Sequence, residues 1–132
     1  MLTVSFGIQK GGVGKTTATA ITAWLLSRRG LRVLAVDLDF QGNLMMLLSQ
    51  RPLRTLEGRM CYEVLKEGNP EKNIAVLTDT LHIIPADDML SAFAGSPETL
   101  RHALSPLQGS YDRVLLYLPL SFFCHALRAC SL

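Results

Sequence analysis

The sequence lacks the features that would tie a chain to a membrane or to a polyanion. No apolar run reaches the roughly 20 residues of a membrane-spanning helix, and Lys10 and Lys15 interrupt the N-terminus, so we expect neither a spanning segment nor a cleaved leader. The net charge of +2 is too small to indicate nucleic-acid binding by itself. These absences predict a cytoplasmic protein without a membrane contact.

Cysteine is scarce and unpaired. The three cysteines, Cys61, Cys124 and Cys130, are odd in number and form no C-x-x-C pair, a usage typical of reduced thiols in a cytoplasm. Cys124, His125 and Cys130 could be imagined as metal ligands, but no fourth ligand with a recognisable spacing accompanies them. We therefore expect an incidental or buried cluster there.

What is present describes an ordinary globular chain. Hydrophobic residues make up 48% of the sequence and charged residues 18%. By length, residues 1–132 predict a single domain that buries about two-thirds of the surface of the unfolded chain.

The most informative stretch is rich in glycine and lies between two apolar segments. Leu2–Ile8 predicts a buried strand, and Thr17–Arg29 has apolar residues at helical spacing, with Gly30 ending the predicted helix. The segment that joins them reads Gln9-Lys10-Gly11-Gly12-Val13-Gly14-Lys15-Thr16-Thr17.

This joining segment has the composition of a phosphate-binding loop. Its three glycines let the backbone curl so that successive N–H groups face one anion, and the start of the next helix adds free N–H groups. In such loops the lysine, here Lys15, meets the outer phosphates and the following hydroxyl, here Thr16, binds Mg²⁺.

A pair of aspartates follows a second predicted strand. Leu31–Val36 is rich in branched apolar residues, and Asp37 and Asp39 stand at its carboxyl end. Because ligands bind beyond the carboxyl ends of parallel strands, we expect both carboxylates near the phosphate loop. They can position Mg²⁺ or orient a water, but turn formation and helix capping explain the same pattern, and both interpretations stay open.

These two segments together resemble one family. The usual phosphate-loop pattern requires glycine where Gln9 stands, and a second lysine, Lys10, begins the loop. This loop resembles the deviant Walker A motif of the ParA/MinD superfamily. The segment from Val36 to Asn43 resembles the ParA/Soj box V-D-x-D-P-Q-G-N, with Phe40 in place of the proline.

The resemblance implies a Mg-ATP-binding ATPase of chromosome or plasmid partition that dimerises around ATP. It implies catalytic roles for Lys10, which would reach the partner subunit's phosphates, for Lys15, and for Asp39, which would help to place the hydrolytic water. Metal ligands would be Thr16 and Asp39. The ATP-binding residues would be Lys10, Gly11, Gly12, Val13, Gly14, Lys15, Thr16 and Thr17.

The expected fold is a three-layer α/β domain of the P-loop NTPase type with a mainly parallel sheet. Several further elements are predicted after the aspartates. They are helices over Leu44–Ser49, Thr55–Lys66, Met89–Ala94 and Glu98–Leu104, a hairpin of Ile74–Leu77 with Leu81–Ile84, and a buried strand over Val114–Leu118.

The last strand carries a departure from the family. Its surroundings resemble the Walker B region Y-D-x-x-x-x-D-x-P-P, but Tyr117 stands in place of the acid and Leu120 in place of the second proline. Tyrosine supplies no carboxylate and is bulkier than aspartate. Asp112 does not replace the acid, because it precedes the strand and belongs at the opposite end of the sheet.

Several functional interpretations stay open. The resemblance covers about the first half of a full-length family member, so 1–132 is expected to be a partial ATPase domain, its nucleotide-binding half. The other half would carry the DNA-binding surface, so no such surface is assigned here. The chain can be a partition ATPase with a partner protein, a nucleotide-binding or dimerisation module impaired by Tyr117, or an incomplete domain that self-associates through an exposed sheet edge. A truncated or frame-shifted gene product would explain the altered end.

Overall fold

The computed structural model describes residues 2–6, 14–49, 61–86 and 97–119. They contain a five-stranded sheet in the order β1-β5-β2-β4-β3. The neighbouring strands β1, β5, β2 and β4 are parallel, and β3 is antiparallel to β4. The strands are β1 (Leu2–Phe6), β2 (Val33–Asp37), β3 (Ala75–Val76), β4 (Leu81–Ile84) and β5 (Arg113–Tyr117).

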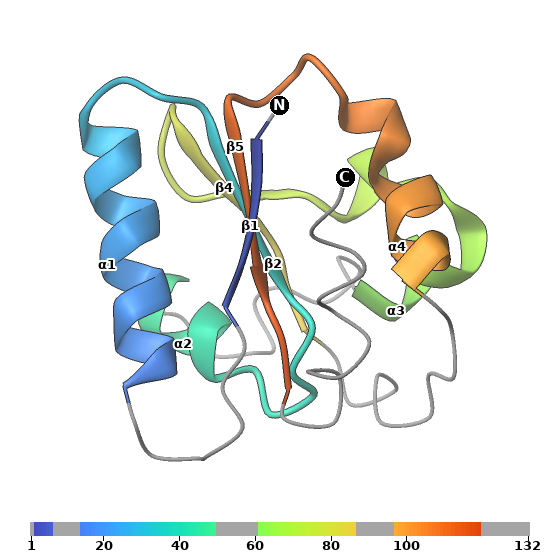
Figure 1. Ribbon diagram of the computed structural model, residues 1–132, viewed down its shortest axis with the longest axis horizontal. Coiled ribbons are helices and arrows are strands. Elements are labelled where there is room, and N and C mark those ends of the chain that lie inside the picture. The colour runs from blue at the N-terminus through green and yellow to red at the C-terminus, as the bar shows by residue number, and fades with distance from the viewer. Residues whose placement is uncertain (1, 7–13, 50–60, 87–96, 120–132) are drawn as a thin grey trace.

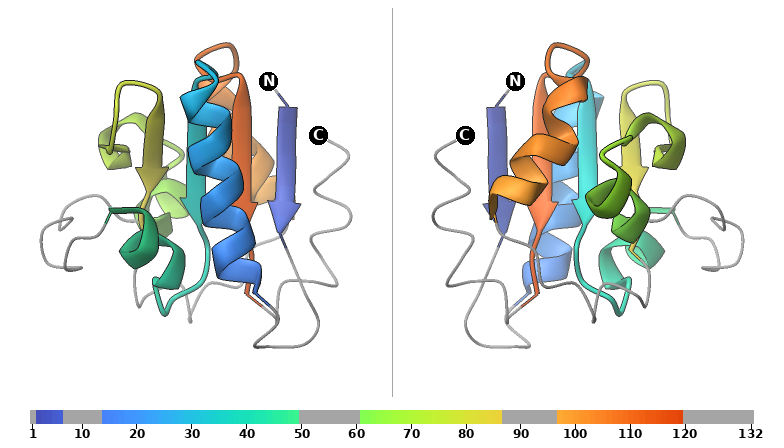
Figure 2. Two further views of the ribbon diagram at one scale, coloured as in Figure 1. Left: turned by 90° about the vertical axis from the view of Figure 1, so that its left-hand side faces the viewer. Right: turned by 90° about the vertical axis from the view of Figure 1, so that its right-hand side faces the viewer.

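Helices cover both faces of this sheet. Helices α1 (Lys15–Arg28) and α2 (Asn43–Ser49) lie on one face, and α3 (Cys61–Glu67) and α4 (Pro97–Leu104) lie on the other (Figures 1 and 2). Two short 3-10 helices, Glu71–Asn73 and Ser105–Leu107, complete the described elements. The predicted three-layer α/β fold with a mainly parallel sheet is confirmed.

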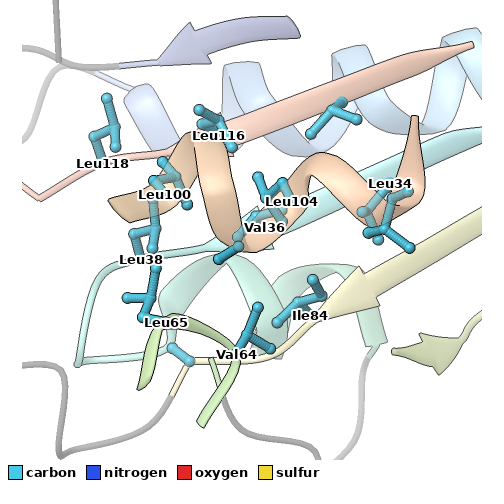
Figure 3. Packing of buried hydrophobic residues seen from close by; sticks show 14 of the residues in the cluster. Leu34, Val36, Leu38, Val64, Leu65, Ile84, Leu100, Leu104, Leu116 and Leu118 are labelled. Carbon is cyan, nitrogen blue, oxygen red and sulfur yellow. The ribbon is translucent and has the colours of Figure 1, made fainter. Parts of the chain in front are cut away.

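The central strands divide their side chains between two cores. Because successive residues of a strand point to opposite faces, Leu34 and Val36 of β2 join the core under α3 and α4, whereas Val33 and Ala35 face α1 and α2. Figure 3 shows the first core, which also contains Val64, Ile84, Leu100, Leu104 and Leu116. The predicted buried strands over Leu31–Val36 and Val114–Leu118 are confirmed within one or two residues.

Strand β1 is less buried than the sequence predicts. The strand covers Leu2–Phe6, while Gly7 and Ile8 lie outside the described residues. Leu2 is 54% exposed and Val4 is 37% exposed. The reason is position: β1 is the edge of the described sheet, as Figure 2 shows, and α1 packs over β2 and β5 instead. The prediction of a strand is confirmed, but the prediction that it is buried is wrong.

Helix α1 starts two residues before the predicted helix. Gly14, with φ of 82°, precedes it, and Gly30, with φ of 86°, follows its C-cap residue Arg29. The left-handed conformation of Gly30 agrees with the predicted helix end. The helix packs on the sheet through small side chains, namely Thr19, Ala20, Ala23 and Ser27.

The elements between β2 and β5 largely follow the predictions. The predicted hairpin forms, because β3 pairs with β4 and the Thr78 hydroxyl accepts hydrogen bonds from the backbone of Thr80 and Leu81. Helix α4 begins at Pro97, as expected for a first-turn proline. Of the helix predicted over Thr55–Lys66, only the part from Cys61 onward is described, and Met89–Ala94 lies outside the described residues. In the described part of the chain, no helix is long and apolar enough to cross a membrane.

Candidate phosphate site

The candidate site lies where three strands end beside the start of α1. Phe6, Tyr117 and Asp37 are the last residues of β1, β5 and β2, and each is in register with its neighbour across the sheet. Parallel strands bring these carboxyl ends to one edge, where ligands bind in open α/β sheets. Lys15 and Thr16 open α1 next to this edge.

The Lys15 ammonium is held over the end of β5. Its Nζ donates a hydrogen bond to the backbone oxygen of Leu118 at 2.5 Å and lies 4.5 Å from the centre of the Tyr117 ring. Partial burial lowers the pKa of Lys15, and the carboxylates of Asp39 and Asp37 oppose this effect. Both aspartates are therefore close enough to Lys15 to act on its charge, while residues 7–13 of the predicted phosphate loop lie outside the described residues.

Asp37 is buried and anchors the backbone that follows it. Its Oδ1 accepts a hydrogen bond from the N–H of Asp39 at 3.1 Å, and its Oδ2 accepts one from the N–H of Met45 at 3.0 Å. Burial raises the pKa of Asp37 to about 7, and the two backbone N–H groups oppose the rise. Of the two interpretations left open by the sequence, turn formation and helix capping describe this residue.

Asp39 is placed differently from Asp37. It is half-buried, and its Oδ1 accepts a hydrogen bond from the N–H of Gln41 at 3.1 Å. Its backbone oxygen accepts one from Gly42, whose φ of 68° suits glycine. Within the described residues, its Oδ2 accepts no hydrogen bond.

Tyr117 occupies the space between the strand end and the helix start. Its phenol oxygen lies 2.5 Å from Oγ1 of Thr16, within hydrogen-bond distance. The ring is buried in the core on the α1 face, together with Ala20, Ala35, Leu44 and Met45. Burial raises the pKa of the Tyr117 phenol. The sequence identified Tyr117 as a missing acid, but the bond that it makes to Thr16 was not foreseen.

The described residues fit a phosphate more readily than a metal ion. A cationic side chain and the first N–H groups of a 14-residue helix suit an anion. For Mg²⁺, the Thr16 hydroxyl is already bonded to Tyr117, and both oxygens of Asp37 accept backbone hydrogen bonds. Among the described residues, no group of three or more His, Cys, Asp or Glu is placed to hold a metal. Of the two predicted metal ligands, Thr16 and Asp39, only Asp39 keeps a side-chain oxygen that accepts no hydrogen bond within the described residues.

The structure describes part of the predicted site. It brings Gly14, Lys15, Thr16, Asp39 and Tyr117 to one edge of the sheet, with Thr17 exposed in the first turn of α1. The remaining predicted loop residues, Lys10, Gly11, Gly12 and Val13, lie outside the described residues, as do Leu120, Cys124, His125 and Cys130.

Fold and site together define a class of protein. These features are typical of a P-loop nucleotide-binding domain: a mainly parallel sheet, a glycine in left-handed conformation, and a helix that begins with Lys15 and Thr16. The family model described as "AAA domain" matches residues 1–127. The chain belongs to this family and is of the ParA/Soj type within the ParA/MinD superfamily.

Three proteins are similar to this chain in sequence or in fold. The chromosome-partitioning ATPase Soj of Thermus thermophilus is 41% identical over 120 residues, which cover 88% of this chain and 45% of Soj. A plasmid partition protein from Borrelia burgdorferi matches the fold with a TM-score of 0.83 at 26% identity, over 97% of this chain and 62% of that one. A cobyrinic acid a,c-diamide synthase from Mycobacterium smegmatis, solved with a bound ATP analogue and magnesium, also gives a TM-score of 0.83. It is 30% identical and covers 98% of this chain and 54% of that one.

The match covers only part of each relative, which limits the functional conclusions that these similarities support. The chain spans about half the length of the curated relatives that it matches, for example 45% of Soj. The activity, substrates and partners of the longer relatives therefore enter only as proposals.

Proposed function

We propose that this chain is the ATP-binding part of a ParA/Soj-type partition ATPase, with residues 1–132 forming one partial domain. The observation that carries the proposal is the position of Lys15 and Thr16, at the start of α1 and beside the carboxyl ends of β5 and β2. The similarity to the partition ATPase Soj supports it. The ATP-binding residues would be Lys10, Gly11, Gly12, Val13, Gly14, Lys15, Thr16 and Thr17.

Each residue of the site would act on the phosphates in its own way. The Lys15 ammonium would exchange the Leu118 carbonyl for the outer phosphates and stabilise the charge that develops there. Asp39, with an oxygen that accepts no hydrogen bond in the described chain, would orient a water. Thr16 and Asp39 are the residues that would hold Mg²⁺, which would neutralise phosphate charge, but the bond between Thr16 and Tyr117 opposes metal binding there.

A second candidate function is a nucleotide-binding or dimerisation module with little turnover. Tyr117 favours it, because a buried phenol occupies the end of β5, where the family carries a carboxylate. Both candidates require ATP binding at Lys15, so binding is the property to test first.

The family also suggests proposals about binding partners and cellular location. We propose that two chains associate around ATP, with Lys10 reaching the partner's phosphates, and that a partition partner protein responds to the nucleotide state. DNA binding would belong to the part of the longer relatives that this chain does not match. The proposed location is the cytoplasm.

ATP should stabilise the folded chain, and this tests the proposal. At an ATP concentration about 100 times the dissociation constant, the free energy of unfolding should rise by about 2.7 kcal/mol. Lys15→Ala should abolish the rise, because it removes the cation that meets the phosphates. Chemical unfolding with and without ATP measures the effect.

A matched control is Lys72→Ala, which removes an exposed lysine from the short helix Glu71–Asn73. This variant should keep the full stabilisation by ATP. Equal stabilisation of the Lys15→Ala and Lys72→Ala variants would show that Lys15 has no part in binding ATP and would contradict the proposed site.

A further inference from the structure

The further inference concerns the Thr16 hydroxyl, which has a partner from within the chain. The Tyr117 phenol oxygen lies 2.5 Å from Thr16 Oγ1, although the two residues are 101 positions apart in the sequence. In a phosphate loop this hydroxyl is the group that reaches Mg²⁺. The tyrosine therefore contacts the loop side chain that would serve as a metal ligand.

The phenol and a metal ion cannot share the same side of this hydroxyl. Mg²⁺ binds oxygen at about 2.0–2.1 Å and requires near-ideal octahedral geometry. An ion on the Tyr117 side of Thr16 would have to occupy the place that the phenol oxygen holds at 2.5 Å. Binding of Mg²⁺ to Thr16 from that side consequently requires the hydrogen bond between the two hydroxyls to break.

The surroundings of Tyr117 hold its ring in this place. The residue is buried among Ala20, Ala35, Leu44 and Met45, on the α1 face of the sheet. The Lys15 ammonium lies 4.5 Å from the ring centre on the side of the site. Because core side chains are closely packed, moving the ring away would disturb these neighbours as well as the bond to Thr16.

We propose that Tyr117 competes with Mg²⁺ for the Thr16 hydroxyl and so determines that this site binds the triphosphate of ATP with little assistance from the metal. Tyr117 is thus a specificity-determining residue that removes the preference for the Mg²⁺-bound nucleotide over the free one. The inference rests on the proposed ATP binding and specifies the form of the nucleotide that binds.

The test compares ATP affinity in excess Mg²⁺ with ATP affinity in a chelator, by calorimetry, for the full chain. For the wild type, the two dissociation constants should agree within about twofold. For Tyr117→Phe, which removes the hydroxyl and keeps the ring, Mg²⁺ should tighten binding about five- to tenfold, the equivalent of one typical hydrogen bond.

Two further variants make the result specific. Tyr111→Phe removes a phenol that bonds to His82 Nδ1 at 2.8 Å, in the core on the other face of the sheet, and should behave like the wild type. Thr16→Val added to Tyr117→Phe should abolish the gain from Mg²⁺, because no hydroxyl remains for the metal to reach.

The outcomes separate this inference from the proposed function. A wild type that gains as much from Mg²⁺ as the Tyr117→Phe variant would overturn the competition while leaving ATP binding intact. A gain that persists without the Thr16 hydroxyl would also overturn it. Absence of ATP binding in every folded variant, with and without Mg²⁺, would overturn the proposed function and the inference with it.

Discussion

At the scale of single residues, the two aspartates at and just after the carboxyl end of β2 have different roles. Asp37 is buried and uses both carboxylate oxygens to hold the backbone of Asp39 and Met45. Asp39 is half-buried and keeps one oxygen without a hydrogen bond in the described chain. The sequence pattern places both near Lys15 but does not separate their roles, because burial depends on how α2 covers the strand end.

The buried Asp37 should make folding stability depend on pH. Its pKa is raised from 3.8 to about 7 in the folded chain, so the folded state binds a proton that the unfolded state releases near pH 4. The free energy of unfolding should therefore fall as the pH rises from about 4 to about 7, by up to about 1.4 kcal/mol per pH unit. Asp37→Asn should reduce this fall. Urea unfolding at pH 5 and pH 8, without nucleotide or metal, measures it.

Asp79→Asn is the control for this measurement, because it removes an exposed carboxylate in the turn between β3 and β4. It should preserve the wild-type dependence on pH. If the Asp37→Asn and wild-type chains lost the same stability between the two pH values, the buried carboxyl would not be the source of the effect.

Tyr117 marks the limit of sequence analysis at this scale. Its identity shows that the family's acid is missing, and the strand before it is readily predicted from its apolar run. The contact with Thr16 is not readable from the sequence, since it joins residues 101 positions apart and depends on the register of β5 between β1 and β2.

At the scale of elements, α1 shows what hydrophobic spacing can and cannot predict. The helix follows from the apolar period, and its C-terminal end follows from Gly30. The buried side of the helix consists of small residues, and the large apolar residues Ile21, Trp24 and Leu25 are about half exposed. The helix lies close to β2 and β5, and its fully buried residues there are small, while Leu26 packs partly buried against the same core.

Some of these large residues border an open groove instead. Ile21 and Trp24 of α1, Leu47 of α2 and Leu77 line a volume of about 430 Å³ beside the sheet. Hydrophobic size alone therefore identifies the wrong face of α1, whereas the small residues Ala20 and Ala23 mark the contact with the sheet.

Enlarging a small residue at this contact should destabilise the fold. Ala23 is 0% exposed and packs against Val33, Leu81 and Leu115. Ala23→Leu should lower the free energy of unfolding by about 1–3 kcal/mol, because the added atoms have no space between α1 and the sheet. Denaturant unfolding measures the change.

Ala18→Leu makes the same substitution at an exposed position of the same helix and should change stability by less than about 0.5 kcal/mol. Equal losses of the free energy of unfolding in the two variants would mean that helix propensity, rather than packing on the sheet, causes the destabilisation.

At the scale of the whole molecule, the fold class and strand positions were predictable, and the exposure of β1 was not. An apolar strand that leads into a phosphate loop is predicted to be buried inside the sheet. In the structure, β1 lies at the edge of the described sheet, and Leu2 and Val4 are partly exposed. The chain spans 45% of the length of Soj.

The central claim is that these residues build a working phosphate site, and a calorimetric titration with ATP tests it most directly. The wild-type chain should bind one ATP with saturation, and the Lys15→Ala variant should release no binding heat. A wild-type chain that is folded by circular dichroism and yet takes up no ATP, with or without Mg²⁺, would contradict the claim.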